Sequence, residues 1–482
     1  MHRATCRDTG ADYLQPACLA IHQGVLEVCV QGKATRIDLF NLRTPQMRAF
    51  HLSWLGFFVC FFAWFALAPL MPLIKGEFGL SNDQLANINI AAVAVTVLGR
   101  LLIGPMCDRY GPRRTYTALL LAGSIPVFGI AFAHSYQTFL FFRLAIGMIG
   151  ASFVITQYHT SVMFAPNVVG TANAASAGWG NAGGGVTQSV MPWICVAVVA
   201  LGVSQAGSWR VAMLLPGMLM VIVGGLYWRF TQDCPQGDYR ELRARGITPD
   251  NGKRGGWAVF RLAMRNYRVW LLFVTYACCF GIELFVHGVA ASYYVDRFGM
   301  NLRSAGLAAG SFGLLALFAR ALGGIVSDRV ARKRGLIART WLLCILMLGE
   351  GLGLLWFSGM QNAGLAVVAM LTFGLFIHMA CGATYALVPF IDRQALGGVA
   401  GIIGAGGNVG AVAAGFVLKS TGSVQHTFML LGGFVIVGSL CALAVRFSSE
   451  HVAREERLYQ EALRQHHGAR GMHAAPAALA VD

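Results

Sequence analysis

Charged residues are scarce in this chain. Asp, Glu, Lys and Arg make up 12% of its 482 residues, and 56% are hydrophobic, whereas a typical soluble domain is about 25% charged. The mean hydropathy is +0.60. A chain so poor in charge cannot cover the surface of a soluble fold, so the composition excludes an ordinary soluble protein and indicates a polytopic membrane protein.

Acidic residues are the scarcer kind, 21 against 37 basic ones, which gives a formal net charge of +16. The basic residues gather in DRYGPRR (108–114), in the stretch 231–267, in DRVARKR (328–334) and in both tails, while the alternate loops carry almost none. This is the distribution that the positive-inside rule predicts. We therefore expect no nucleic-acid partner, but a multi-pass protein of the plasma (inner) membrane with both termini in the cytoplasm.

Three further absences limit the functional class. None of the twelve cysteines falls in a predicted external loop, so no disulfide framework is expected. The N-terminus lacks the basic start and apolar stretch of a secretory signal peptide. The sequence contains no H-E-x-x-H, no G-x-S-x-G and no Cys/His cluster with metal-ligand spacing. We expect neither an enzyme nor a metal site nor a cofactor.

Long apolar segments, by contrast, are abundant. A spanning helix needs about 20 apolar residues, and twelve segments qualify, which predicts an all-α membrane protein of twelve transmembrane helices in two six-helix halves. Their approximate limits are 50–74, 84–106, 115–133, 137–164, 168–201, 209–230, 268–295, 302–327, 335–358, 363–390, 396–419 and 426–447. The predicted division is an N-terminal cytoplasmic segment (1–47), a first half (48–230), a cytoplasmic linker (231–267), a second half (268–447) and a cytoplasmic tail (448–482).

An internal repeat carries two arginines into the membrane. GRLLIGPMCDRYGPRR (99–114) aligns without gaps on ARALGGIVSDRVARKR (319–334), and Arg100 falls on Arg320. An arginine inside a membrane helix normally faces the bundle interior and marks a substrate path. Parallel halves place the substrate between them near the midplane. The repeat therefore predicts a central site with two positive charges, which suits an anion.

The end of this repeat resembles a motif of the major facilitator superfamily. The spacing G-x-x-x-D-R-x-x-x-[RK]-R follows the second helix of each half, and a generic basic loop is the alternative interpretation. The resemblance implies a loop that braces the inward gate. Its acidic and basic members here are Asp108, Arg109, Arg113, Asp328, Arg329 and Lys333.

Two predicted helices are rich in glycine and contain one asparagine each. AGWGNAGGGVTQ (177–188) includes Asn181, and GIIGAGGNVGAVAAG (401–415) includes Asn408. Glycines let membrane helices approach closely, so close packing alone explains the glycines. A buried amide, however, must hydrogen-bond to something. The two asparagines therefore predict a narrow cavity for a very small substrate.

These two stretches resemble the paired signature motifs of the nitrate/nitrite porter family, and so do FFAWFALAPLMPLI, CCFGIEL and CGATYALVPFIDR, over roughly residues 36–447. The resemblance implies a major facilitator fold that transports nitrate and nitrite. A planar guanidinium suits a planar oxyanion. The implied substrate-binding residues are Arg100, Arg320, Asn181, Asn408, Tyr276, Phe153 and Phe280. For the two phenylalanines, simple packing in the bundle core is the alternative.

The coupling ion is a separate question. Glu283 is seven residues, two helical turns, from Tyr276 and so lies on nearly the same face. We predict that it couples nitrate import to proton symport, because the G-x-E-L stretch resembles the symport branch of the family. Three alternatives stay open: a nitrate/nitrite antiporter, an exchanger of organic anions or phosphate esters, and a nitrate-binding membrane sensor. The expected partners are nitrate, nitrite, protons and the lipid bilayer, with a functional monomer.

Overall fold

The fold is described from a computed structural model of the chain. The structure describes residues 32–165, 168–246, 256–392, 396–450 and 452–453, with only the backbone of 108, 256–259, 332, 389 and 396–397. The predicted N-terminal segment therefore lies largely outside the described residues, and so does nearly all of the predicted tail.

Within that part of the chain, twelve helices or helix runs are long and apolar enough to cross a membrane, and each of their ends lies within five residues of the prediction. The first six consist of α2 (Pro45–Phe65) with η1 (Ala68–Leu70) and α3 (Met71–Phe78), α4 (Asn82–Tyr110), α5 (Pro112–Gly129) with η2 (Ile130–Phe132), α6 (Tyr136–Ile146) with η3 (Gly147–Ala151) and α7 (Ser152–Met163), α8 (Val169–Ala200), and α9 (Ser208–Ala212) with α10 (Leu214–Phe230). The last six consist of α13 (Tyr267–Phe298), α14 (Leu302–Leu314) with α15 (Ala316–Arg334), α16 (Ile337–Ser358), α17 (Ala363–Leu387), which ends in η5 (Val388–Phe390), α18 (Leu396–Thr421) and α19 (Val424–Ala444).

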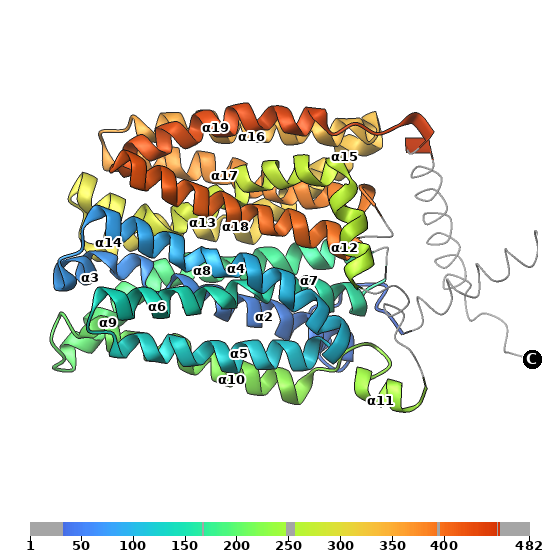
Figure 1. The fold of residues 1–482 in the computed structure, drawn as a ribbon, viewed down its shortest axis with the longest axis horizontal. Helices are drawn as coiled ribbons and strands as arrows, with labels where there is room; N and C mark the ends of the chain where they lie inside the picture. The colour runs from blue at the N-terminus through green and yellow to red at the C-terminus, as the bar shows by residue number, and fades with distance from the viewer. Residues whose placement is uncertain (1–31, 166–167, 247–255, 393–395, 451, 454–482) are drawn as a thin grey trace, which may run out of the picture.

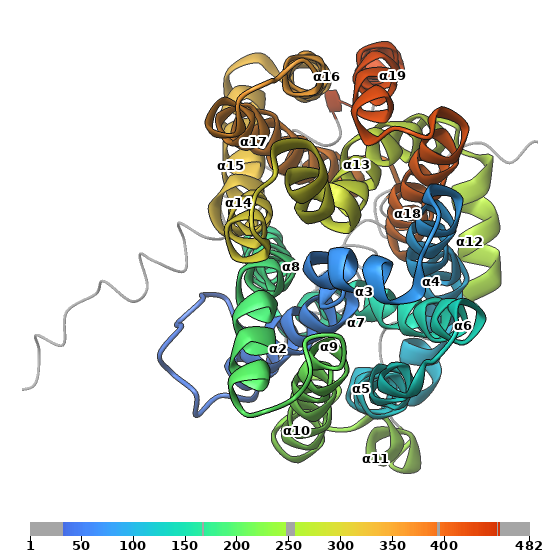
Figure 2. The same ribbon diagram turned by 90° about the vertical axis from the view of Figure 1, so that its left-hand side faces the viewer.

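The long helices run side by side along the molecule (Figure 1). Seen from one end, α2 to α10 form one half and α13 to α19 form the other (Figure 2). The halves meet where α4 packs against α18 and where α8 packs against α14 and α15. The fold is therefore the predicted all-α membrane fold of two six-helix halves.

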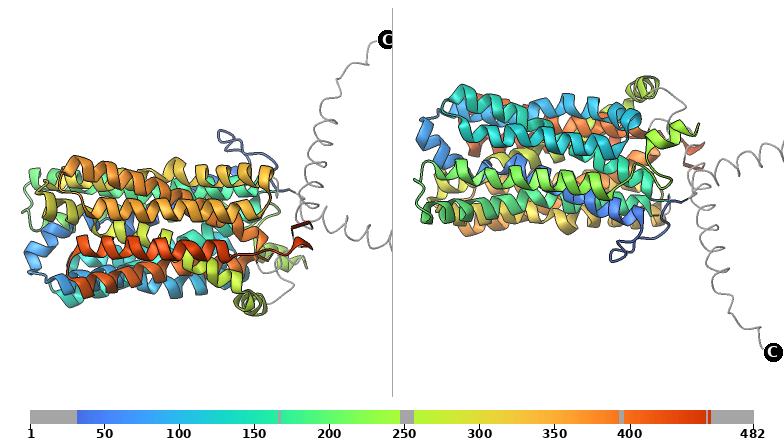
Figure 3. Two further views of the ribbon diagram at one scale, coloured as in Figure 1. Left: turned by 90° about the horizontal axis from the view of Figure 1, so that it is seen from above. Right: turned by 90° about the horizontal axis from the view of Figure 1, so that it is seen from below.

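The stretch between the halves contains two short helices, α11 (Tyr239–Ala244) and α12 (Gly256–Arg265). Helix α12 runs across the direction of the bundle (Figure 1). Both short helices lie at the same end of the molecule as the first and last described residues (Figure 3). We call this the linker end.

Two helices extend further towards the linker end than predicted. Helix α4 continues to Tyr110 and α15 continues to Arg334, so the Asp-Arg steps of the repeated motif lie on helices instead of loops. Pro105 lies inside α4, but no proline or glycine follows it before Gly111, and none lies between Gly324 and Gly335 in α15. The φ angles of Gly111 and Gly335 are 86° and 77°. Positive φ is easily adopted by glycine alone, and these two glycines end the helices.

The glycines around the two asparagines allow close helix crossings. A Cβ atom on Gly180 would lie 2.0 Å from the Phe57 ring of α2, and one on Gly407 would lie 2.3 Å from the Phe280 ring of α13. Both distances are far below van der Waals contact. The same crossing thus occurs once in each half, and it brings α8 and α18, with their asparagines, to the centre of the bundle.

Candidate substrate site between the two halves

The seven predicted substrate-binding residues come together inside the bundle, from six helices. Arg100 lies on α4, Phe153 on α7, Asn181 on α8, Tyr276 and Phe280 on α13, Arg320 on α15 and Asn408 on α18. All are buried, and even the two arginines are only 2% and 5% exposed. Buried guanidinium groups within a membrane span are costly unless something compensates for the charge. Their surroundings therefore decide what the site can bind.

The ring of Phe280 joins the two arginines. The Cζ atoms of Arg100 and Arg320 each lie 5.3 Å from its centroid, and Arg100 lies 5.5 Å from the Phe153 ring as well. Tyr276 stacks on Phe280 at 5.1 Å with an interplanar angle of 18°. The contacts of the two arginines with these rings are cation–π contacts, which are attractive. The two phenylalanines thus contact the charged groups of the site and do more than fill the core.

Arg320 is neutralised within the protein. Its Nη2 donates to Oε2 of Glu283 at 2.5 Å, and Asn181 donates its amide to Oε1 of the same carboxylate. His378 Nδ1 lies 3.4 Å from Oε2, and the thiol of Cys381 donates to it at 3.6 Å. Glu283 is fully buried. A carboxylate without water is stable when it has such partners, so Glu283 and Arg320 form a compensated pair.

Arg100 has a different environment. Its Nη1 donates to the backbone oxygen of Gly404 on α18 at 2.5 Å, a contact that links the two halves. Its Nε and Nη2 are buried and have no hydrogen-bond partner among the described residues. One guanidinium thus keeps two unused donors, although its counterpart in the repeat is paired.

Other predicted residues also have unused polar atoms, among them Nε of Arg320 and Oδ1 of Asn181. The Tyr276 hydroxyl and both amide atoms of Asn408 are buried without a partner in the described part of the chain. Buried polar groups are satisfied in the great majority of cases. Together with Arg100, these atoms supply donors from α4, α13 and α18 and one positive charge in excess. An anion with several acceptor oxygens matches this set.

Comparison with known proteins agrees with this geometry. The family model described as Major Facilitator Superfamily matches residues 53–392. The high affinity nitrate transporter 2.5 of Arabidopsis thaliana is 38% identical over 421 residues, which cover 87% of this chain and 83% of that protein. The nitrate/nitrite transporter NrtP of a Picosynechococcus species is 29% identical over 453 residues, with coverage of 76% and 84%. The chain belongs to the nitrate/nitrite porter family of the major facilitator superfamily.

Solved structures with the same fold are more distant in sequence. The D-xylose–proton symporter aligns with a TM-score of 0.62 and 14% identity over 85% of this chain and 99% of its own. An inward-facing bacterial homologue of the lysosomal transporter Spinster aligns with a TM-score of 0.63 and 13% identity over 84% and 99%. These likenesses concern the fold alone. The resemblance to the porter family, inferred from the glycine-rich stretches, is confirmed by the relatives.

Helix α17 contributes residues that the sequence reasoning did not place in the site. The Tyr385 ring centroid lies 5.1 Å from Tyr276 and 5.6 Å from Phe153, edge to face in both cases. His378 and Cys381 contact Glu283, as described. The stretch CGATYALVPFIDR, already recognised as typical of the porter family, contained Tyr385 and Cys381. The resemblance of this stretch to the porter family indicated its importance, but it did not indicate which of its residues lie next to Tyr276 and Glu283.

Arg143 and Glu350 are also buried within the spans. Arg143 on α6 donates from Nη1 to the backbone oxygen of Trp64 at 2.7 Å, where α2 comes to its end. Glu350 on α16 is fully buried, and neither of its carboxyl oxygens has a partner among the residues described. It therefore lacks the neighbours that allow Glu283 to carry a charge.

The predicted gate residues lie at the linker end. Arg113 forms an ion pair with Asp238, and its Nε and Nη2 donate to the Trp228 oxygen. The Arg109 oxygen accepts a hydrogen bond from Arg243. In the second half, Asp328 pairs with Arg339 at 2.7 Å, a partner that the motif did not include. Arg329 and Lys333 are exposed, and the side chain of Asp108 lies outside the described part of the structure.

A buried carboxyl fixes the turn between α4 and α5. Asp233 accepts hydrogen bonds from the backbone N–H groups of Arg113 and Tyr239, each at 2.9 Å. A Cβ atom on Gly111 would lie 2.3 Å from this carboxyl group. Burial raises the pKa of Asp233 to about 6, although both N–H groups act to lower it. The carboxyl thus joins the start of α5 to the segment that leads into α11.

Proposed function

We propose that this chain imports nitrate, with nitrite as a second substrate, by alternating access coupled to proton symport. The observation that carries the proposal is the set of unpaired donors of Arg100, Asn408 and Tyr276 beside a second arginine that is already neutralised. The relatives are named for transport of the same substrates.

The charge balance of the site favours a small monoanion. Arg100 and Arg320 carry two positive charges and Glu283, while it is ionised, carries one negative charge, so the empty site keeps one positive charge that attracts an anion. Nitrate is planar and presents three equivalent acceptor oxygens, which a guanidinium fork and amide donors can bind in one plane. Phe153 and Phe280 lie against Arg100 and would hold such an anion between aromatic faces. The glycine crossings leave little room for a bulky substrate.

Proton coupling follows from competition for Arg320. While Glu283 is ionised, Arg320 and the Asn181 amide bind the carboxylate. A proton on Glu283 weakens both contacts and leaves their donors to the incoming anion. Loss of that proton restores the ion pair and expels the anion. Binding of the proton and binding of nitrate therefore favour each other, which is the thermodynamic requirement for symport.

Alternating access would rock the two halves about this site. We propose that the halves comprise residues 48–230 and 268–447, that the linker end faces the cytoplasm with both termini, and that a monomer in the plasma membrane is functional. The gate would be the repeated motif at the linker end. There, the ion pair Arg113–Asp238 ties the first half to the linker and the ion pair Asp328–Arg339 ties two helices of the second half, so each pair would brace its own half as the halves move.

The test is nitrate uptake into proteoliposomes under an imposed inward proton gradient. We expect Glu283→Gln to lose gradient-driven uptake but to keep nitrate counterflow. Glu77→Gln is the matched control, because Glu77 also pairs with an arginine, Arg210 at 2.7 Å, but far from the site. Gradient-driven uptake that survives Glu283→Gln would refute the coupling role of this residue.

The buried ion pair between Glu283 and Arg320 also favours a second candidate, an antiporter of nitrate and nitrite. An ion pair that never takes up a proton would make Glu283 a permanent counter-charge of Arg320, and the carrier would then only exchange anions. Uptake that occurs only from nitrite-loaded vesicles and ignores the proton gradient would establish this candidate. Competition by organic phosphates would indicate an organic-anion exchanger, and binding without any flux would indicate a sensor.

A further inference from the structure

A second polar site lies at the linker end of the first half, away from the central site. It is a pocket of about 490 Å³ between the start of α2, the start of α5, the end of α10 and the segment that leads into α11. Its volume falls within the range of about 300–1,000 Å³ typical of ligand pockets. Arg48, Arg113 and Arg229 line it together with Asp238 and Glu241.

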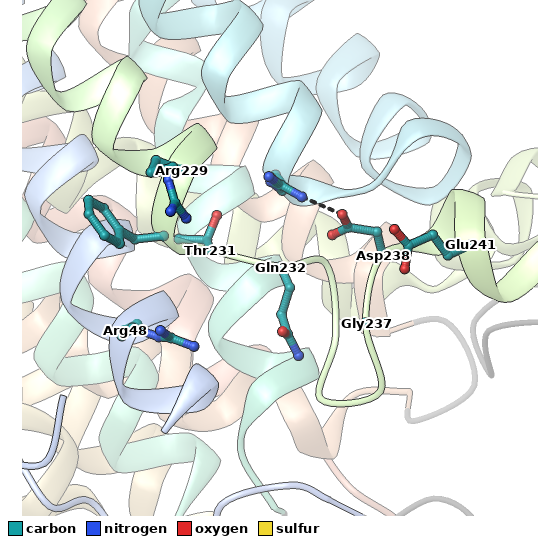
Figure 4. A pocket seen from close by; sticks show the side chains of 9 residues that line it. Arg48, Arg229, Thr231, Gln232, Gly237, Asp238 and Glu241 are labelled. Carbon is teal, nitrogen blue, oxygen red and sulfur yellow. Dashed lines mark hydrogen bonds and ion pairs between the residues drawn. The ribbon is translucent and has the colours of Figure 1, made fainter. Parts of the chain in front are cut away.

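The charges of this pocket are not evenly balanced. Arg113 and Asp238 neutralise each other, and the second oxygen of Asp238 accepts the backbone N–H of Asp233 at 3.2 Å. Figure 4 shows Arg48 and Arg229 on one side of the pocket, and Asp238 and Glu241 on the other. Within the described chain neither Arg48 nor Arg229 forms an ion pair, and Arg48 Nε is buried without a partner. One side of the pocket is therefore cationic and unoccupied by any carboxylate.

The position of the pocket relative to the membrane indicates the source of its ligand. Arg229 and Phe230 are the last two residues of the span Ser208–Phe230, and Arg48 lies in the first turn of the span Pro45–Phe78. Both arginines therefore stand where helices leave the membrane, which is the level of lipid headgroups. Phe230 lines the pocket and is 45% exposed, so an apolar surface lies next to the cationic one.

We propose that this pocket binds the phosphate of an anionic phospholipid headgroup between Arg48 and Arg229. The phosphate would supply the acceptors that these two side chains lack, and Phe230 would contact the apolar part of the same lipid. A lipid bound there would join α2 to α10 and to the linker segment. The proposal does not depend on the substrate of the central site.

The test compares lipid binding by the purified protein in detergent with short-chain phosphatidylglycerol, short-chain phosphatidylcholine and inorganic phosphate. We expect phosphatidylglycerol to bind more tightly than the other two. The double variant Arg48→Gln/Arg229→Gln should weaken its binding about thirtyfold, since each basic residue near a membrane surface contributes about 1 kcal/mol. The charge-preserving variant Arg48→Lys/Arg229→Lys should keep most of the affinity, which guards against misfolding as an explanation.

Arg303→Gln is the matched control, because Arg303 stands on Trp193 at the opposite end of the bundle (4.9 Å from Cζ to the ring centroid). It should bind phosphatidylglycerol as the unaltered protein does. Unchanged phosphatidylglycerol binding in the glutamine double variant would overturn the proposal. Inorganic phosphate that binds as tightly as the lipid would overturn the lipid source and assign the pocket to a soluble phosphate.

Discussion

Replacing Asn408 with alanine is expected to weaken nitrate binding while changing the stability of the protein little. Both amide atoms of Asn408 are buried without a partner in the described chain, so its removal breaks no internal hydrogen bond. Asn181, its counterpart in the repeat, donates to Glu283 instead. The two asparagines therefore make a matched pair whose substitutions should have different consequences.

The magnitudes follow from the contacts. A hydrogen bond to a charged group contributes about 1.5–3 kcal/mol, and each 1.4 kcal/mol is a tenfold change in affinity. Asn408→Ala should therefore raise the dissociation constant for nitrate roughly 10- to 150-fold. A buried polar atom without a partner costs about 1–3 kcal/mol, and losing two of them offsets the lost packing. Asn181→Ala, in contrast, takes a donor from a buried carboxylate and should destabilise the fold by at least about 1–3 kcal/mol.

Nitrate titration of the thermal unfolding temperature would measure both effects, with the half-saturation of nitrate counterflow as a second readout. In the absence of nitrate, Asn408→Ala should unfold near the temperature of the unaltered protein and Asn181→Ala at a lower one. If Asn408→Ala bound nitrate as well as the unaltered protein does, Asn408 would not contact the substrate. If both variants lost equal stability, the inferred difference between the hydrogen bonding of Asn408 and that of Asn181 would be refuted.

Three further predictions concern packing, pH and the second buried acid. Gly183→Ala should cost about 1–3 kcal/mol of stability, because its Cβ would lie 2.2 Å from the backbone oxygen of Phe58. Gly170→Ala, on the same helix, should be tolerated, because its Cβ would meet nothing within 4 Å. Thermal unfolding of the two variants would compare them. The pKa of Asp233 rises from 3.8 to about 6 in the fold, so its contribution to stability is complete below about pH 4 and is lost as the pH rises through 6. The unfolding temperature measured across this pH range should vary less in Asp233→Asn than in the unaltered protein. Glu350→Gln should leave stability and gradient-driven uptake nearly unchanged, because neither carboxyl oxygen of Glu350 has a partner among the described residues that the substitution would remove. A large loss of uptake would show that Glu350 takes part in transport.

The sequence predicted the membrane spans, which the structure confirms. It also named seven residues that the structure brings together in the bundle interior, but it did not predict how they pair. Long apolar segments determine the spans, and the repeat relates Arg100 to Arg320 independently of any structure. The Tyr276–Glu283 spacing placed the acid near the site. It did not show that Glu283 binds Arg320 and Asn181 at once, because such pairing depends on helix rotation and on side-chain conformations. The partner Arg339 of Asp328 was missed for the same reason, since it belongs to the following helix.

The repeat is symmetric in its backbone but not in its charges, and the difference bears on how the carrier would work. Gly180 contacts Phe57 just as Gly407 contacts Phe280, so the two crossings are equivalent. Three residues beyond Phe280 lies Glu283, but three residues beyond Phe57 lies Cys60. A site with two arginines and no acid would change its net charge each time a monoanion binds or leaves, and buried charge is costly within the membrane. With Glu283, the empty site with the acid ionised and the loaded site with the acid protonated carry the same net charge, because the proton offsets the anion. In the proposed mechanism, this asymmetry between the halves would allow one proton and one anion to influence each other.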